Sequence, residues 1–489
     1  MRRWAIVLAP WLCSCAATLE PMAAFPAEDA PIAAAPAGRA MPTGPIIAAP
    51  PTWIGAAPSQ SVIVPGNGAP MWIGIWVATP EAAPPTKRPP MSLALVVDTS
   101  GSMAGPKIDN ARLAATSLLE GVTAGDVVAI DAFSNEVRVV VPPTVIQPGN
   151  LGALVRAVQG LGAMGGTNLH EGLRVGTAHA AAAVAHPLRR VIVISDGLAN
   201  VGPSTPDALG ELAAQGTENG VQVSAIGVGL DYDERTLGEL ARRSSGRLYH
   251  LEEPSQLAGI LDQEVRLLST TVATGAYLEI SAGSGVEIEG AEFADAQREG
   301  NVWRVRLGSL YAGQRREVLM RARVHGAPGS EPELAKVKLV YEDRTENGRW
   351  SAQSVALHAR VSDDAKAAAA SSDARVQAMV ARHDAAEAQR QAAMMMSHGR
   401  TDEAAATLGK AEQTVVAAAK RADDPAERAR LTAQAARMSQ TRDQVVRADK
   451  KPAKARALSL ETYQYSFSDD GLAPPAKPQP MPASAPAKK

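Results

Sequence analysis

The sequence has almost no cysteine: its two cysteines, Cys13 and Cys15, both lie within the first fifteen of 489 residues. The remainder of the chain therefore has no internal disulfide and no thiolate metal site. The eight histidines show no HExxH motif and no clustered spacing, which argues against a zinc site. The net charge is only −2, so no general electrostatic attraction for nucleic acid is expected.

Common catalytic motifs are missing as well. Ser100 lies in no G-x-S-x-G nucleophile elbow. The glycine-rich stretch 160–166 is not followed by the GK[ST] of a phosphate-binding loop. These absences argue against a serine hydrolase and a nucleotide-binding enzyme, and we expect a non-catalytic protein.

The first fifteen residues have the pattern of an export signal. Two arginines precede a short apolar stretch, which is too short to span a bilayer as a helix. The ending Leu12-Cys13-Ser14-Cys15 resembles the lipobox of bacterial lipoproteins, which implies cleavage before a lipid-bearing Cys15. The alternative is an ordinary signal peptide followed by release into the periplasm. Because Ala16 is not the Asp that retains lipoproteins in the inner membrane, the resemblance favours a lipoprotein of the outer membrane.

The segments outside the central region differ in composition and period. We expect an Ala/Pro-rich linker, early strands that join a later sandwich, an antiparallel β-sandwich with period-two alternation, a helical region, and a tail that contains a β-like run at 458–468. The pattern of the helical region predicts three helices, with breaks near 397–400 and 421–425. They form either a plain bundle or a packing that includes a single tetratricopeptide-like half-repeat. The linker spans 16–59, the early strands 60–90, the sandwich 270–362, the helical region 363–455 and the tail 456–489.

Residues 91–268 alternate short apolar runs with helical patterns. Runs that are apolar throughout are typical of strands buried on both faces. The alternation predicts an α/β fold with a doubly wound, mostly parallel sheet. The run at 136–143 follows a tight turn and is expected to be an antiparallel edge strand. Asp131, in an otherwise apolar run, is expected at an edge or at a strand end.

Five oxygen-bearing residues follow the ends of these elements. Asp98, Ser100 and Ser102 come directly after the first strand, Thr167 follows two glycines before a helix, and Asp196 follows another buried strand. Carboxyl ends of parallel strands meet at one edge of an open sheet, where ligands bind. Taken singly, each residue is better explained as a helix cap. Together they predict a site for a hard divalent cation.

The order and spacing of these residues resemble a von Willebrand factor type A domain over about 91–268. The resemblance implies a metal-ion-dependent adhesion site formed by Asp98, Ser100, Ser102, Thr167 and Asp196, with Mg²⁺, Ca²⁺ or Mn²⁺ as the ion. It implies that an acidic residue of a partner protein completes the ion's coordination. The wider arrangement is similar to bacterial relatives of the inter-alpha-trypsin inhibitor heavy chains. We therefore expect a cell-envelope protein for adhesion or complex assembly; the alternative is a scaffold whose metal site is only structural and whose helices make the contacts.

Overall fold

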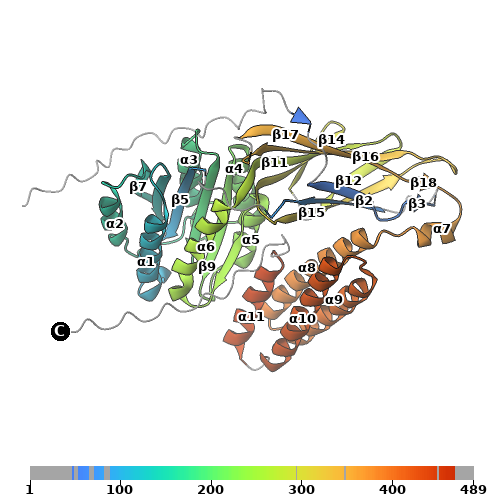
Figure 1. Cartoon of the computed structure of the whole chain (residues 1–489). Coiled ribbons are helices and arrows are strands. Elements are labelled where there is room, and N and C mark those ends of the chain that lie inside the picture. The colour runs from blue at the N-terminus through green and yellow to red at the C-terminus, as the bar shows by residue number, and fades with distance from the viewer. Residues whose placement is uncertain are drawn as a thin grey trace, which may run out of the picture. The chain divides into compact units, whose positions relative to one another are not determined.

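The structure is a computed structural model, drawn in Figure 1, and the described part of the chain is discontinuous. The predicted signal peptide, with Cys15, and most of the predicted linker lie outside this part. No helix within it is both long enough and apolar enough to cross a membrane. The described residues are 47–48, 53–64, 71–81, 89–292, 295–345, 348–448 and 451–467.

The α/β unit is built on a six-stranded sheet with the order β10-β9-β8-β5-β6-β7. The neighbours from β10 to β6 run parallel, and β7 runs antiparallel at the edge. The predicted doubly wound, mostly parallel sheet is confirmed, and so is its antiparallel edge strand. The strands are β5 (Met91–Asp98), β6 (Val127–Phe133), β7 (Val137–Val145), β8 (Leu188–Ser195), β9 (Val221–Val228) and β10 (Leu248–Leu251).

Helices cover both faces of this sheet. Successive strand side chains point to opposite faces, so each strand contributes to two cores. In β5, Val96 packs in one core with Leu173, while Leu95 packs in the other with Leu118. The helical elements are η1 (Gly101–Met103), α1 (Pro106–Gly121), α2 (Leu151–Gln159), α3 (Leu169–Ala182), α4 (Pro206–Glu218), α5 (Glu234–Arg243), η2 (Pro254–Gln256) and α6 (Leu257–Ser269).

Asp131 does not lie at an edge or at a strand end, so that prediction is wrong. It is an interior residue of β6, aligned with Val96 of β5 on one side and Val139 of β7 on the other. Its buried Oδ2 lies 3.0 Å from Nδ1 of His179 on α3. Burial raises the pKa of Asp131, and the histidine opposes that rise. A partner on the covering helix explains why an acidic residue can occupy a buried strand.

The second unit consists of two sheets with the orders β1-β17-β16-β11-β14-β13 and β12-β15-β4-β2. Ile75 from one sheet and Leu339 from the other belong to a single apolar core, as in a β-sandwich. A further pair, β3 with β18, runs parallel. The strands are β1 (Ile47–Ala48), β2 (Ile54–Pro58), β3 (Val62–Ile63), β4 (Met71–Ala78), β11 (Thr271–Ala282), β12 (Val286–Glu292), β13 (Ala296–Glu299), β14 (Val302–Tyr311), β15 (Arg315–Val324), β16 (Glu333–Asp343), β17 (Arg349–His358) and β18 (Arg360–Val361).

The linker predicted for 16–59 extends too far. Residues 54–58 form β2, which pairs antiparallel with β4. Ile54 is buried, and Trp53 stacks on Tyr341 with 4.6 Å between the ring centroids. Contacts with a large neighbouring sheet therefore order an Ala/Gly/Pro segment that has no pattern of its own.

The α/β unit is an insertion between two strands of the sandwich. It follows β4, which pairs with β15, and it precedes β11 of the other sheet. One turn, 311–314, contacts the chain at both crossings. At the first crossing, Thr79 N donates to Gln314 O at 2.9 Å; at the second, Ala312 N donates to Thr270 O at 2.9 Å. The two ends of the insertion are therefore held by the same turn.

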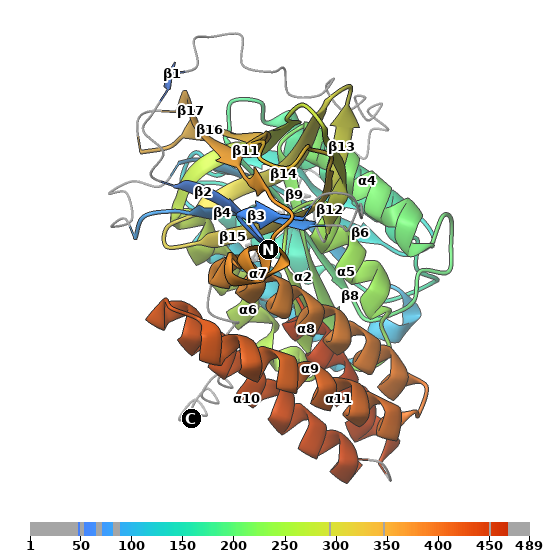
Figure 2. The same cartoon turned by 90° about the vertical axis from the view of Figure 1, so that its right-hand side faces the viewer.

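Among the C-terminal helices, α9 packs between α8 and α10, and α11 packs mainly against α8 (Figure 2). The predicted breaks near 397–400 and 421–425 are confirmed, and Asp424 Oδ1 accepts from Ala426 N at 2.9 Å at the start of the third long helix. The β-like run at 458–468 is wrong: most of it is helical, so the predicted tail from 456 begins inside a helix. The helices are α7 (Ala365–Ala370), α8 (Ala374–Ser397), α9 (Thr401–Arg421), α10 (Pro425–Ala448) and α11 (Pro452–Tyr465).

Candidate metal centre

Two carboxylates lie at the carboxyl ends of neighbouring strands. Asp98 is the last residue of β5, and Asp196 directly follows β8, which pairs with β5. Both side chains are fully buried. Ser195 Oγ donates to Asp98 Oδ2 at 2.6 Å, which links the two strand ends. The topology of the sheet therefore brings together two acidic residues that are 98 positions apart in the chain.

The two serines extend this arrangement from one aspartate to the other. Ser100 N donates to Asp98 Oδ1 at 2.8 Å, and the hydroxyls of Ser100 and Ser102 are 3.1 Å apart. Ser102 Oγ then donates to Asp196 Oδ1 at 2.8 Å. Four of the five predicted ligands are thus connected by hydrogen bonds.

Thr167 enters the same space from a separate loop. A Cβ atom built on Gly197 would lie 3.5 Å from Ser102 Oγ and 3.7 Å from Thr167 Oγ1. Both hydroxyls therefore face the short segment that follows Asp196. Thr167 itself is buried, and its N donates to Asn200 Oδ1 at 2.8 Å. The structure thus brings all five predicted residues together, whereas Cys15 lies outside the described residues.

The position of Thr167 depends on the helix that follows it. Asn168 caps α3 by accepting from Glu171 N at 3.2 Å. A Cβ on Gly176 would lie 2.2 Å from Val96 Cγ2, so only glycine permits α3 to approach β5 this closely. On the other side of the threonine, Gly165 has a φ of +80°, a conformation that glycine adopts readily. The two glycines thus place the threonine loop over the end of β5.

The charges at the site leave an excess of negative charge. Burial raises the pKa of Asp98, hydrogen bonds from Ser100 and Ser195 oppose the rise, and the nearby Asp196 adds to it. The ammonium of Lys107, on α1, forms an ion pair with Asp196 Oδ2. Two buried carboxylates thus face one ammonium. Because unpaired buried charge is costly, a further cation would be stabilising here.

The donor set is suited to a hard divalent cation. It contains two carboxylates and three hydroxyls, all of them oxygen donors of the kind that Mg²⁺, Ca²⁺ and Mn²⁺ prefer. Within the described residues, no group of three or more His, Cys, Asp or Glu side chains could hold a metal ion. A metal at this place would therefore depend on the serine and threonine hydroxyls. The residues fit such an ion, which would supply a positive charge able to accept another carboxylate.

Three residues that support the site were not singled out from the sequence. They are Lys107, which contacts Asp196, Ser195, which contacts Asp98, and Asn200, which holds Thr167. Ser195 directly precedes Asp196 in the sequence, and this position could have identified it as a neighbour of the site. No comparable signal exists for Asn200, because its role depends on where two separate loops meet.

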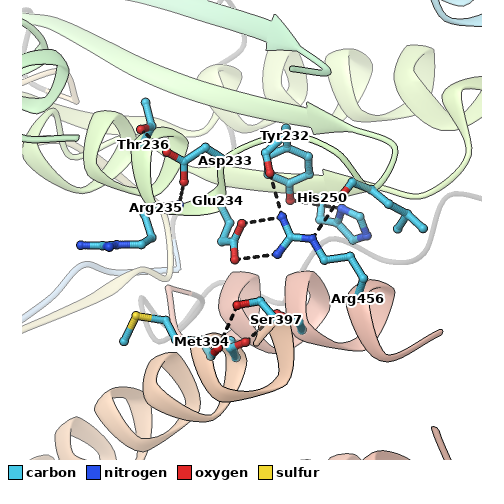
Figure 3. A network of polar contacts seen from close by, with 12 residues as sticks. Tyr232, Asp233, Glu234, Arg235, Thr236, His250, Met394, Ser397 and Arg456 are labelled. Carbon is cyan, nitrogen blue, oxygen red and sulfur yellow. Dashed lines mark hydrogen bonds and ion pairs between the residues drawn. The ribbon is translucent and has the colours of Figure 1, made fainter. Parts of the chain in front are cut away.

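The helical region also contacts the loop before α5, as Figure 3 shows. From α11, Arg456 donates to both carboxylate oxygens of Glu234 at 2.8 and 2.7 Å. It also donates to Leu230 O at 3.0 Å and to Tyr232 O at 2.8 Å. At the start of this loop, a Cβ on Gly229 would lie 3.6 Å from Lys107 Cε. The loop 229–233 therefore lies between the lysine at the candidate site and the arginine of α11.

Comparisons with known proteins agree with this fold. An uncharacterized protein of Synechocystis sp. is 25% identical over 53% of this chain and 63% of its own length. Inter-alpha-trypsin inhibitor heavy chain H3 of Mesocricetus auratus is 28% identical over 43% of this chain and 25% of its own. The match thus spans less than two thirds of either relative. A solved von Willebrand factor type A structure from Catenulispora acidiphila has a TM-score of 0.64 at 19% identity, covering 75% of this chain and 87% of that one.

The family model of the von Willebrand factor type A domain matches residues 92–263. Except for Met91 at the start of β5, this range contains the six strands of the α/β sheet and all five candidate ligands. Domains of this kind typically serve adhesion or protein interaction. The α/β unit of this chain is a von Willebrand factor type A domain.

Proposed function

We propose that this chain is a non-catalytic cell-envelope protein that binds a protein ligand through a divalent cation. The convergence of five oxygen-bearing side chains on the ends of β5 and β8 carries the proposal. Motif spacing alone is compatible with a set of unrelated helix caps. A connected cluster with excess negative charge is the arrangement that a cation would stabilise.

In this proposal Asp98, Ser100, Ser102, Thr167 and Asp196 hold Mg²⁺, or Ca²⁺ or Mn²⁺ in its place. Three of the five ligands are neutral hydroxyls, so the two carboxylates only balance the ion, and the ammonium of Lys107 leaves the site with net positive charge. An aspartate or glutamate of the partner would bind to that charge. The hydroxyls of Ser100 and Ser102 hydrogen-bond to each other, and Ser102 Oγ donates to Asp196 Oδ1, so the partners of both hydroxyls lie within the proposed ligand set.

The proposed location is the bacterial cell envelope, with a lipid on Cys15 as the membrane anchor. The lipobox-like sequence 12–15 supports this part of the proposal. The Ala/Pro-rich segment between Cys15 and β1 would act as a spacer between membrane and sandwich.

Metal binding is tested first, by titrating Mg²⁺ into the full chain in a calorimeter and following Mn²⁺ by electron paramagnetic resonance. Asp98→Asn removes a negative charge and Thr167→Val removes a hydroxyl ligand, and both variants should lose binding. Asp109→Asn is the matched control, because Asp109 is an exposed aspartate on α1. Wild-type protein that binds neither ion would overturn the proposal.

Partner binding is tested by affinity capture from an envelope extract with the full chain, in Mg²⁺ or in EDTA. A partner held only by the wild type with Mg²⁺, and lost by Asp98→Asn, supports metal-bridged adhesion. Partners held equally in all samples would contradict it and favour a scaffold role, in which the helices make the contacts and the metal only stabilises the fold.

A further inference from the structure

The three loops that carry the candidate ligands form one continuous surface. They comprise residues 99–105, 162–168 and 197–205. Met164 N donates to Thr99 O at 2.7 Å and Gly101 N donates to Gly165 O at 3.0 Å, which joins the first two loops. Asn200 N donates to Thr167 O at 3.1 Å, which joins the second to the third. A partner that reaches the candidate metal centre must therefore contact all three.

Two large apolar side chains stand out on this surface. Met164 is 71% exposed and Leu198 is 58% exposed. Met103, in the first loop, is by contrast fully buried. Single exposed apolar residues are common on proteins, but these two come from different loops, and each lies within three residues of a candidate ligand.

The same loops contain no charged side chain. Their sequences, TSGSMAG, GAMGGTN and GLANVGPST, lack Asp, Glu, Lys and Arg altogether. The positive charges at the centre of this surface are thus those of the ion and of Lys107, whose ammonium is already paired with Asp196, while the atoms of the three loops are apolar or neutral. One carboxylate can be satisfied there, and additional acidic residues next to it would lose hydration without gaining a partner.

We infer that the partner presents a single aspartate or glutamate flanked by apolar side chains, which pack against Met164 and Leu198. This inference rests on the proposed function, because the carboxylate binds the ion. It adds that the flanking contacts are hydrophobic. The surface therefore selects an isolated acidic residue in an apolar context and discriminates against an acidic run.

The test uses a phage-displayed library of cyclic peptides with one fixed central aspartate and random flanking positions. The full chain is immobilised in Mg²⁺, and bound phage are eluted with EDTA. We expect Leu, Ile, Met or Phe to be enriched on at least one side of the aspartate. Binding of the enriched peptides should change little between low and moderate salt. The reason is that the three loops carry no charged side chains whose attraction salt could screen.

Variants locate the contact. Met164→Ser and Leu198→Ser should each weaken binding of the selected peptides about tenfold, as expected for the loss of most of one buried apolar side chain. Their Mg²⁺ affinity should equal that of the wild type, because neither side chain is a candidate ligand. Val184→Ser is the matched control: Val184 is 69% exposed but precedes β8, at the opposite end of the sheet from Asp196.

The outcomes separate this inference from the function on which it rests. Enrichment of acidic or polar flanking residues, or full binding by both loop variants, would overturn the apolar contact while leaving metal-bridged carboxylate binding in place. No enrichment in the EDTA eluate, from a chain that binds Mg²⁺, would overturn both.

Discussion

Arg456 of α11 forms a two-pronged ion pair with Glu234, the first residue of α5, and also bonds to two carbonyl oxygens of the preceding loop. The carboxylate of Glu234 is almost completely buried. One side chain thus connects the last described helix to a loop that passes close to Lys107 at the candidate metal centre.

Removing this arginine should destabilise the chain. In Arg456→Ala the buried carboxylate of Glu234 loses its partner, which costs about 3 kcal/mol in free energy of unfolding. Urea unfolding measures the loss, and hydrogen exchange should place the increased opening at the start of α5. Arg400→Ala is the control, since Arg400 pairs with Glu403 at an exposed position, and should leave stability unchanged. Equal stability of the two variants would contradict the prediction.

Mg²⁺ should stabilise the folded chain. An ion that binds only the native state at one hundred times its dissociation constant adds about 2.7 kcal/mol to the free energy of unfolding. Thermal unfolding with and without Mg²⁺ should therefore give a higher melting temperature for the wild type and for Asp109→Asn. Asp98→Asn and Thr167→Val should show no such shift, and a shift of normal size in either would exclude that residue as a ligand.

Asp131 should make the stability depend on pH. Its pKa in the folded chain is raised above the ordinary 3.8, so its contribution is fully present below that pH and is lost as the pH rises through the raised pKa. Asp131→Asn cannot titrate. The stability of the wild type relative to this variant should therefore fall as the pH rises above 3.8 and through the raised pKa, as measured by urea unfolding over a range of pH. A difference that stays constant over this range would show that Asp131 titrates alike in both states.

His179 supplies the other half of that pair. His179→Ala should cost about 3 kcal/mol at pH 7, because it leaves the carboxylate of Asp131 buried without its partner. In an Asp131→Asn background the same substitution should cost much less, since no charge remains to be compensated. The double-mutant cycle measures this coupling, and additive losses would refute it.

Cys15→Ala should release the protein from membranes. If Cys15 carries the lipid, mass spectrometry of the membrane fraction should find an acylated Cys15 at the mature N-terminus of the wild type. Cys13→Ala, two residues away, should leave that modification intact. A membrane-bound wild type with an unmodified Cys15 would refute the lipid anchor.

The local sequence was sufficient where a residue's role follows from its position at a strand end. Asp98, Ser100, Ser102, Thr167 and Asp196 occur in a fixed order on elements with clear periodicity, and the structure brings them together. Lys107 and Asn200 depend on contacts between loops, which no local pattern encodes.

The misassigned helix α11 shows how two periods can coexist in one stretch. Leu458, Leu460 and Thr462 alternate with polar residues, and such alternation is typical of a strand, as predicted for 458–468. The buried face nevertheless follows helical spacing through Ala455, Ser459 and Tyr463. Ser459 Oγ donates to Ala393 O of α8 at 2.8 Å, so packing against a neighbouring helix decides the outcome.

The insertion of the α/β unit also bears on how the chain would transmit mechanical force. A force applied at the ends of β5 and β8 is transmitted out of this unit through two covalent connections, one at Thr79 and one at Thr270. Both paths are bonded to the turn 311–314, which joins β14 of one sheet to β15 of the other. If the chain binds a partner as proposed, tension from that partner would therefore be divided between the two sheets of the sandwich.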